Sequence, residues 1–135
     1  MIFVLDTTSF SAAMRNEPEM VYFLSTHRPG EIMTVPPVVA EIEYGIQRID
    51  PLSKKHALLS AQRERILTVI SVLSWDPDSS IQFGRIKTEL EKAGTPIDDF
   101  DIAIAAISIS HGAEVITANL AHFKQITGVQ SRHWK

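Results

Sequence analysis

Short apolar runs recur along the chain, and each has the length and composition of a buried strand. The first is Ile2-Phe3-Val4-Leu5, which is continuous and shows no polar alternation. Strands of a parallel sheet are covered on both faces, so they read as continuous apolar runs. The pattern therefore predicts strands at 2–5, 32–35, 71–75, 114–117 and 128–129.

The segments between these runs carry helix signals. Pro36-Pro37 opens a helix that continues through residue 46, because proline suits the first turn, where its missing N–H is not needed. Further helices are expected through 12–14, 17–25, 78–92, 102–109 and 119–124. The longest predicted helix spans 52–70, with an expected buried stripe of Leu58, Leu59, Ile66, Leu67 and Ile70.

The order of these elements predicts the fold class. Strands that alternate with helices, with no hairpin signal between them, favour a parallel sheet with helices on both faces. We therefore expect a three-layer α/β/α sandwich around a central, mostly parallel sheet of about five strands. The 135 residues match the usual size of one domain, and no linker or repeat divides them. Residues 1–135 are thus predicted to form a single domain.

Composition and charge exclude some classes of protein. The chain has no cysteine, so disulfides, thiolate metal sites and cysteine nucleophiles are excluded. A net charge of −3 argues against a sequence-nonspecific nucleic-acid coat protein, although a metal-dependent enzyme with a local basic patch stays possible. No apolar run has bilayer length, and the N-terminus lacks the basic region of a signal peptide. We expect a soluble, cytoplasmic protein without membrane association.

Two acidic residues stand at positions where a ligand-binding or catalytic role is expected. Asp6 directly follows the first predicted strand, and open parallel sheets bind ligands at the carboxyl ends of their strands. The alternative for Asp6 is an N-cap of the next helix. Glu41 lies in a largely apolar helix, and Gly45, one turn later on the same face, leaves room for close approach. The alternative for Glu41 is an ordinary water-facing glutamate.

The densest group of acids is Asp98, Asp99 and Asp101. At helical spacing Asp98 and Asp101 share a face, whereas Asp99 is turned away by about 100°. Capping and compensation of the helix dipole explain one or two of these acids better than all three. Asn119 follows the strand that ends at Thr117, on the side where a ligand is expected, although asparagine is also a common turn residue.

Carboxylates at Asp6, Glu41 and Asp101 would be suited to metal chemistry if they converge. Carboxylates in one crevice repel one another unless a cation neutralises them. Mg²⁺ and Mn²⁺ prefer oxygen ligands and keep water in their coordination shell. Such an ion can orient a phosphodiester, stabilise transition-state charge and activate a water molecule.

Four segments, in order and at the right separations, resemble those of PIN-domain ribonucleases, in particular the VapC-like toxins of toxin–antitoxin pairs. The resemblance covers essentially the whole chain. The segments are Phe3-Val4-Leu5-Asp6-Thr7; the stretch 38–45 around Glu41; Gly94-Thr95-Pro96-Ile97 with the following 100–106; and Val115-Ile116-Thr117-Ala118-Asn119 through Phe123, with Gly128, Val129 and Trp134.

This resemblance implies a metal-dependent endoribonuclease that hydrolyses RNA with Mg²⁺ or Mn²⁺. It implies that Asp6, Glu41 and Asp101 are the acidic metal-binding set and that Asn119 occupies the family's fourth position. We expect Asp99 to be a further metal-binding acid, with Asp98 as another accessory candidate. The implied partners are an RNA substrate, a cognate antitoxin protein and a second copy of the chain in a homodimer. His122 stands where relatives carry an acid.

Two rival functions remain open at this point. A phosphoacceptor receiver domain also places an acid after its first strand, but it needs an acidic pair there and a lysine after a late strand. Here Thr7 follows Asp6, and Ala118 follows Thr117. The second rival is a degenerate PIN-like domain that binds RNA or protein without cutting, which the non-acidic Asn119 keeps open.

A basic edge for the RNA backbone is a further hypothesis. Its candidates are Lys54, Lys55, Arg63 and Arg65 in the longest predicted helix. The alternative, which we favour at this point, is that they are solvated helix charges.

Overall fold

The computed structural model describes all 135 residues, and its centre is one five-stranded sheet in which every pairing is parallel. The strand order is β3-β2-β1-β4-β5, so the chain builds the sheet outward in both directions from β1. The strands are β1 (Ile2–Leu5), β2 (Ile32–Thr34), β3 (Ser71–Val72), β4 (Ala113–Ile116) and β5 (Gln130–Arg132).

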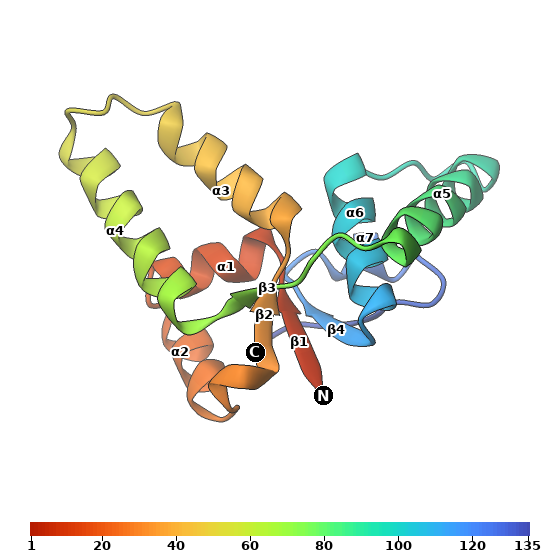
Figure 1. Ribbon diagram of the computed structural model, residues 1–135, viewed down its shortest axis with the longest axis horizontal. Coiled ribbons are helices and arrows are strands. Elements are labelled where there is room, and N and C mark those ends of the chain that lie inside the picture. Colours follow the sequence, from red (N-terminus) through yellow and green to blue (C-terminus); the bar gives the residue numbers. More distant parts are fainter.

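Helices connect each strand to the next and cover the two faces of the sheet. Figure 1 shows the first four helices on one side and the next two on the other, so the predicted three-layer α/β/α sandwich is confirmed. None of the helices is both long and apolar enough to cross a membrane. The helices are α1 (Thr7–Met14), α2 (Pro18–Ser25), α3 (Pro36–Gln47), α4 (Lys54–Val69), α5 (Pro77–Lys92), α6 (Asp99–Ser110) and α7 (Leu120–Phe123), with a 3-10 turn η1 (Pro29–Glu31) before β2.

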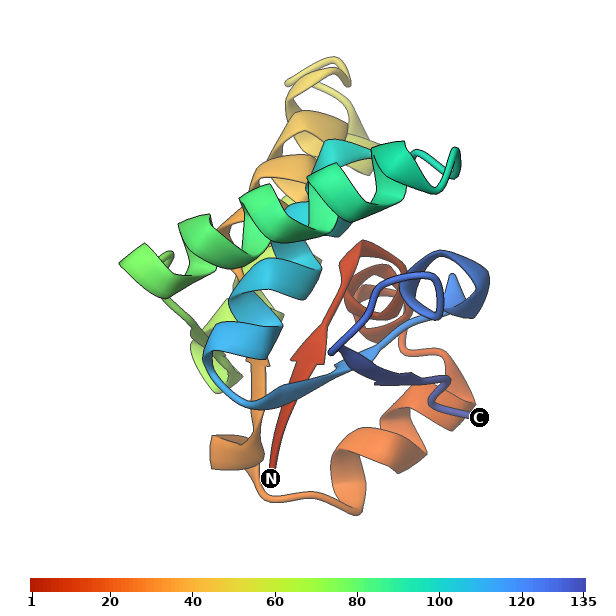
Figure 2. The same cartoon turned by 90° about the vertical axis from the view of Figure 1, so that its right-hand side faces the viewer.

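The helices form two arms that rise beyond the carboxyl ends of the strands. One arm is the α3–α4 pair and the other contains α5 and α6, as Figure 1 shows. In the view turned by 90°, α5 crosses over α6, and the two are in extensive contact (Figure 2). The arms therefore flank the sheet edge at which Asp6 was expected.

The core explains why these sequence runs became these elements. Val4, Leu5, Val115 and Ile116 are completely buried, as continuous apolar strands covered on both faces must be. Helix α6 is buried along 102–108, because its many small residues let it lie close against β4 and α5. Proline begins α3 as predicted.

Two predicted strands differ from the structure by more than one residue at an end. The last strand is 130–132 and not 128–129, because Gly128 has φ +97°, a left-handed turn conformation that a strand cannot contain. Strand β3 ends at Val72, because its neighbour β2 ends at Thr34 and the chain turns into α3 at Pro36.

The predicted stripe of the long helix was also wrong in one position. Ile66 and Ile70 are buried and Leu59 and Leu67 partly so, but Leu58 is 57% exposed. Leu59 lies two turns before Ile66 on the same face, whereas Leu58 is rotated by about 100° from it. Helix α4 packs on α1 and α3 with one side only, which leaves Leu58 in solvent.

Candidate metal-dependent active site

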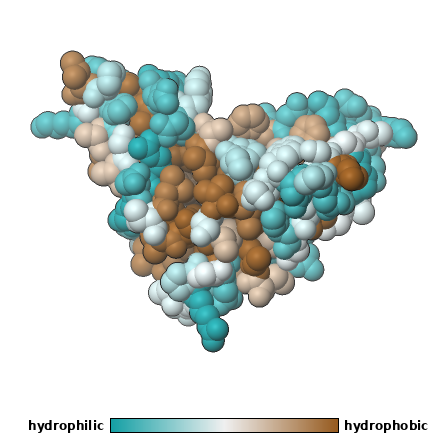
Figure 3. Space-filling model, viewed as in Figure 1, coloured by the Kyte–Doolittle hydropathy of each residue, from teal (hydrophilic) through white to brown (hydrophobic).

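The candidate site lies at the topological switch point of the sheet, between β1 and β4, where strands on one side of β1 are followed by strands on its other side. Asp6 follows β1, and Thr117 follows the adjacent β4. A parallel sheet opens a crevice at such a switch point, because the connections from the two strands leave in opposite directions. The space-filling view shows an open notch between the two arms above this edge (Figure 3). The fold thus brings residues 111 positions apart into contact.

Asp6 is buried, with 1% of its surface exposed, and it is held by donors from three directions. Its Oδ1 accepts hydrogen bonds from the Thr8 hydroxyl at 2.7 Å and from the Ser9 N–H at 3.0 Å. Its Oδ2 accepts one from the Thr117 hydroxyl at 2.5 Å. The bond from Ser9 caps α1, so the N-cap alternative is correct and coexists with the place of Asp6 at the site.

Residues 117–119 reinforce this arrangement from the other strand. The Ala118 N–H donates to the Thr8 hydroxyl at 2.9 Å, and the Asn119 N–H donates to the Thr117 hydroxyl at 2.8 Å. Each hydroxyl therefore accepts from the backbone and donates to Asp6. Sequence reasoning missed Thr117, although it follows a strand end just as Asp6 does, and that position was the available signal.

Glu41 reaches the site from the α3 arm. The Thr7 hydroxyl donates to its Oε1 at 2.6 Å, which ties α3 to the start of α1. Gly45 has no atom within 4 Å of the position of an added Cβ, and with Glu41 it lines a groove of about 280 Å³ between α1, α3 and α4. Glu43, two positions further along α3, instead pairs with Arg63 of α4.

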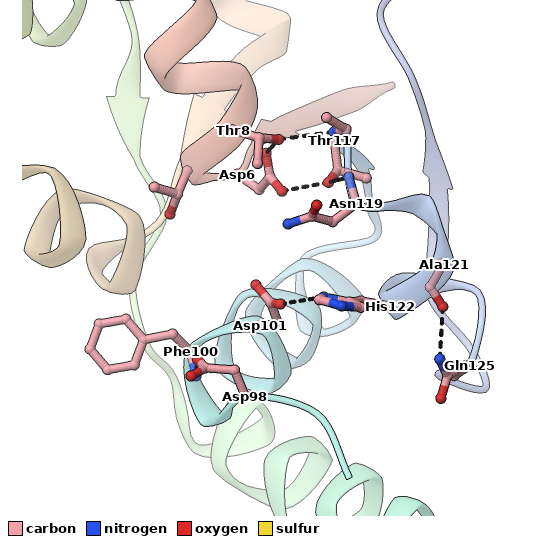
Figure 4. A network of polar contacts seen from close by, with 12 residues as sticks. Asp6, Thr8, Asp98, Phe100, Asp101, Thr117, Asn119, Ala121, His122 and Gln125 are labelled. Carbon is pink, nitrogen blue, oxygen red and sulfur yellow. Dashed lines mark hydrogen bonds and ion pairs between the residues drawn. The ribbon is translucent and has the colours of Figure 1, made fainter. Parts of the chain in front are cut away.

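Asp101 enters from α6 on the opposite arm. Its side chain is 16% exposed, and its Oδ2 lies 3.0 Å from Nδ1 of His122. Figure 4 shows Asp6 and Asp101 facing each other, with the amide of Asn119 reaching between them. Asn119 precedes α7, yet its side chain makes no capping hydrogen bond. Capping of α7 therefore does not account for the position of the Asn119 amide.

The electrostatics show which acids share this space. Partial burial raises the pKa of Glu41, and the charges of Asp101, Asp98 and Asp6 raise it further, against the hydrogen bond from Thr7. Burial also raises the pKa of Asp101, with contributions from Asp6 and Asp98, against the lowering effect of His122. We call Asp6, Glu41, Asp98 and Asp101 the carboxylate cluster.

Asp99 lies outside the carboxylate cluster. It is exposed and its carboxylate pairs with Lys87 of α5 at 3.0 Å. Asp98 instead caps α6, accepting from the Phe100 N–H at 2.8 Å, and its charge acts on Glu41 and Asp101. The helical spacing that sets Asp98 on the face of Asp101 and turns Asp99 away was the signal for this difference.

The donor chemistry of the carboxylate cluster fits a hard divalent cation. The Oε2 atom of Glu41 and the Oδ1 atom of Asp101 accept no hydrogen bond, and Oδ2 of Asp6 accepts only one. As they stand, no three histidine or acidic side chains lie close enough together to hold a metal ion. Mutually repelling oxygens with spare lone pairs suit an ion that retains water ligands.

Comparison with known proteins agrees with this geometry. The chain is 29% identical to the tRNA(fMet)-specific endonuclease VapC of Salmonella typhimurium, over 98% of this chain and 97% of that protein. It resembles the structure of DNA-bound VapBC from Salmonella typhimurium, with a TM-score of 0.87 at 27% identity, covering 100% and 99% of the two chains. A second similar structure is VapBC2 from Rickettsia felis bound to a DNA fragment from its promoter, with a TM-score of 0.86, 26% identity and full coverage of both chains.

The match to a family description completes the assignment. The family model described as the PIN domain matches residues 3–129, which include every member of the carboxylate cluster and Asn119. The resemblance inferred from the motifs is therefore confirmed: the chain belongs to the PIN domain family.

Proposed function

We propose that the protein is a metal-dependent endoribonuclease and the toxin of a toxin–antitoxin pair. One observation carries the proposal: in a chain of the PIN domain family, Asp6 at the β1–β4 switch point, Glu41 of one arm and Asp101 of the other lie close enough for their charges to act on one another. The relatives named as VapC ribonucleases support the same reaction class. No observation supports a receiver domain, since the donors to the Asp6 carboxylate are Thr8, Ser9 and Thr117 and no lysine of the chain contacts it.

Asp6, Glu41 and Asp101 would hold Mg²⁺ or Mn²⁺, with Asp98 as an accessory acid and Asn119 assisting a ligand or water. The bound ion would supply charge stabilisation to the phosphodiester and a more acidic water molecule. The chain's own contribution is orientation. Thr8 and Thr117 fix the carboxylate of Asp6, and Thr7 fixes that of Glu41.

Cleavage of RNA by the purified protein, free of antitoxin, tests this proposal. Total tRNA is the first substrate to use, because one relative is a tRNA(fMet)-specific endonuclease. We expect cleavage with Mn²⁺, none with chelator, and none from Asp6→Asn or Glu41→Gln. Glu43→Gln is the matched control, since Glu43 lies on the same helix as Glu41 but pairs with Arg63.

Cleavage by Asp6→Asn at the wild-type rate would overturn the assignment of the site. Binding of tRNA without turnover, by folded protein at saturating Mn²⁺, would instead support the non-catalytic alternative. Circular dichroism of each variant shows whether it is folded.

The proposed partners follow from the same family. We propose a small antitoxin, because the similar structures are VapBC complexes, and a site of action in the cytoplasm. We also propose a homodimer. An apolar groove of about 370 Å³ beside the notch, with Trp75 and Phe100 each 42% exposed, is consistent with association. Light scattering of the purified chain measures its oligomeric state, and a monomer at micromolar concentration contradicts this part.

A further inference from the structure

A polar groove opens beside the carboxylate cluster, toward the last residues of the chain. It has a volume of about 480 Å³, and we call it the polar groove. Thr7 and Thr8 line one end of it, and their hydroxyls donate to Glu41 and Asp6. The polar groove is therefore separated from Glu41 and Asp6 only by the threonines that hydrogen-bond to them. Its other lining residues include Arg15, Glu17, His133 and Lys135.

The polar groove carries more positive than negative charge. Arg15 and Lys135 both approach Glu17, at 3.6 Å and 3.9 Å, so two cations share one acid. The Trp134 indole N–H also donates to Glu17 at 2.9 Å, which fixes that carboxylate in place. The side chains of Arg15 and Lys135 are 61% and 54% exposed, whereas Glu17 is only 25% exposed. The two cations of the groove are therefore more exposed to solvent than the acid between them.

The basic edge considered from the sequence has no comparable arrangement. Arg63 is paired one-to-one with Glu43, and Arg65 donates to the carbonyls of Ala13 and Met14 at the end of α1. Lys54 and Lys55 begin α4 at its outer end, in neither the polar groove nor the carboxylate cluster. The polar groove is thus the cationic surface that adjoins the candidate site.

We propose that the polar groove binds the RNA strand that flanks the cleaved phosphodiester, with Arg15 and Lys135 contacting its backbone phosphates. The inference rests on the proposed function, since it assumes that the scissile phosphate lies at the carboxylate cluster. The physical reason is charge. Carboxylates and a net charge of −3 disfavour the approach of a polyanion, and cations beside the cluster offset that repulsion by contacting the neighbouring phosphates.

The test measures binding without cleavage. A fluorescein-labelled 12-nucleotide RNA of mixed sequence is titrated with protein carrying Asp6→Asn, in chelator, between 50 and 200 mM KCl. Fluorescence anisotropy gives the association constant at each salt concentration. The comparison is between this background and the same background with Arg15→Gln and Lys135→Gln.

The expected result follows from counterion release. Each lost phosphate contact to a single strand reduces the slope of log K against log salt by about 0.7, so two lost contacts reduce it by about 1.4. Lines that differ by this slope and meet at 1 M salt are about 25-fold apart at 0.1 M. Lys54→Gln with Lys55→Gln is the matched control, because it removes the same charge elsewhere and leaves the slope unchanged.

Three outcomes overturn the inference: no binding of the RNA, an unchanged slope in the Arg15 and Lys135 double variant, or an equal loss in the Lys54 and Lys55 control. These outcomes are distinct from failure of the proposed function. Cleavage of tRNA together with an unchanged slope supports the proposed function and overturns RNA binding by the polar groove. A protein that cuts nothing but shows the expected slope keeps the groove as an RNA-binding surface.

Discussion

Nδ1 of His122 lies 3.0 Å from Oδ2 of Asp101, and this contact joins α7 to α6 beside the carboxylate cluster. The imidazole counteracts the burial that raises the pKa of Asp101. It also fixes the carboxylate in one orientation and leaves its Oδ1 unengaged. His122 is therefore a positioning residue for a proposed metal ligand, with a role analogous to that of the outer-shell partners found around many metal sites.

Replacing His122 tests this positioning role. We expect His122→Ala to weaken Mn²⁺ binding by roughly tenfold, which is the lower end for loss of an outer-shell partner. His122→Gln, which keeps an N–H donor, should recover part of the affinity. Isothermal titration with MnCl₂ measures the affinity without reliance on turnover. Equal affinity in the wild type and His122→Ala contradicts the role.

Thr117 connects stability to the site. Its hydroxyl is buried, donates to Asp6 and accepts from the Asn119 N–H. Thr117→Val keeps the shape but leaves both partners unsatisfied, so we expect a loss of about 1–3 kcal/mol in the free energy of unfolding. Thr117→Ser retains the hydroxyl and is the control. Urea unfolding of both variants measures the difference, and a neutral Thr117→Val disproves the account.

The raised pKa of Glu41 predicts how stability depends on pH and metal. A carboxyl whose pKa is higher in the folded state favours folding when protonated, and this stability is lost as pH rises through the folded value. In chelator, the wild type should therefore lose stability relative to Glu41→Gln as pH rises from about 4.5, its ordinary pKa, toward neutrality. Added Mn²⁺ should restore the wild type and leave Glu41→Gln unchanged.

Thermal unfolding at pH 5 and pH 7, with chelator and with Mn²⁺, gives the four temperatures needed. If Glu41→Gln gains as much from Mn²⁺ as the wild type does, Glu41 is not a ligand. Glu43→Gln is again the control, because its carboxylate is engaged by Arg63.

The lowered pKa of Asp76 predicts the opposite dependence of stability on pH. It caps α5 and accepts hydrogen bonds from Ser110 at 2.7 Å and from Ser79 at 2.8 Å, and these bonds lower its pKa to about 2. A lowered pKa means that its stabilising effect is present above the ordinary value of 3.8 and is lost as pH falls toward 2. The wild type should exceed Asp76→Asn in urea midpoint at pH 6, with the gap closing between pH 4 and pH 2. A gap independent of pH would refute this.

Periodicity predicted the layers because they depend on local rules that the tertiary structure did not override. A continuous apolar run such as 2–5 has one good place in a soluble protein, the middle of a covered parallel sheet. The same rule placed Asp6 and Asn119 at the carboxyl edge of the sheet, because each follows the end of such a run. The predictions that Leu58 is buried and that β3 reaches residue 75 failed, because both depend on where neighbouring elements end. Local sequence does not encode that.

The side-chain contacts at the site lay beyond sequence reasoning for a similar reason. The pairing of His122 with Asp101 and of Thr7 with Glu41 depends on how two arms are placed across the sheet. Asp98 and Asp99 differ by one position, and their separation into two environments needed the angle of α6 and the position of Lys87. Helical phase indicated the direction of each, but it did not identify their partners.

The hydrogen bond between Asp6 and Thr117 also has a consequence in time. The two residues are 111 positions apart, so Asp6 is synthesised long before its partner. At about 5–20 residues per second, that interval is roughly 6–22 seconds. For nearly all of it the nascent chain lacks β4 and α7, and throughout it the chain lacks the Thr117 hydroxyl that donates to Oδ2 of Asp6. A nuclease built in this way would be inert while it is being translated up to β4 and α7, and it would become competent only once those elements are free to fold.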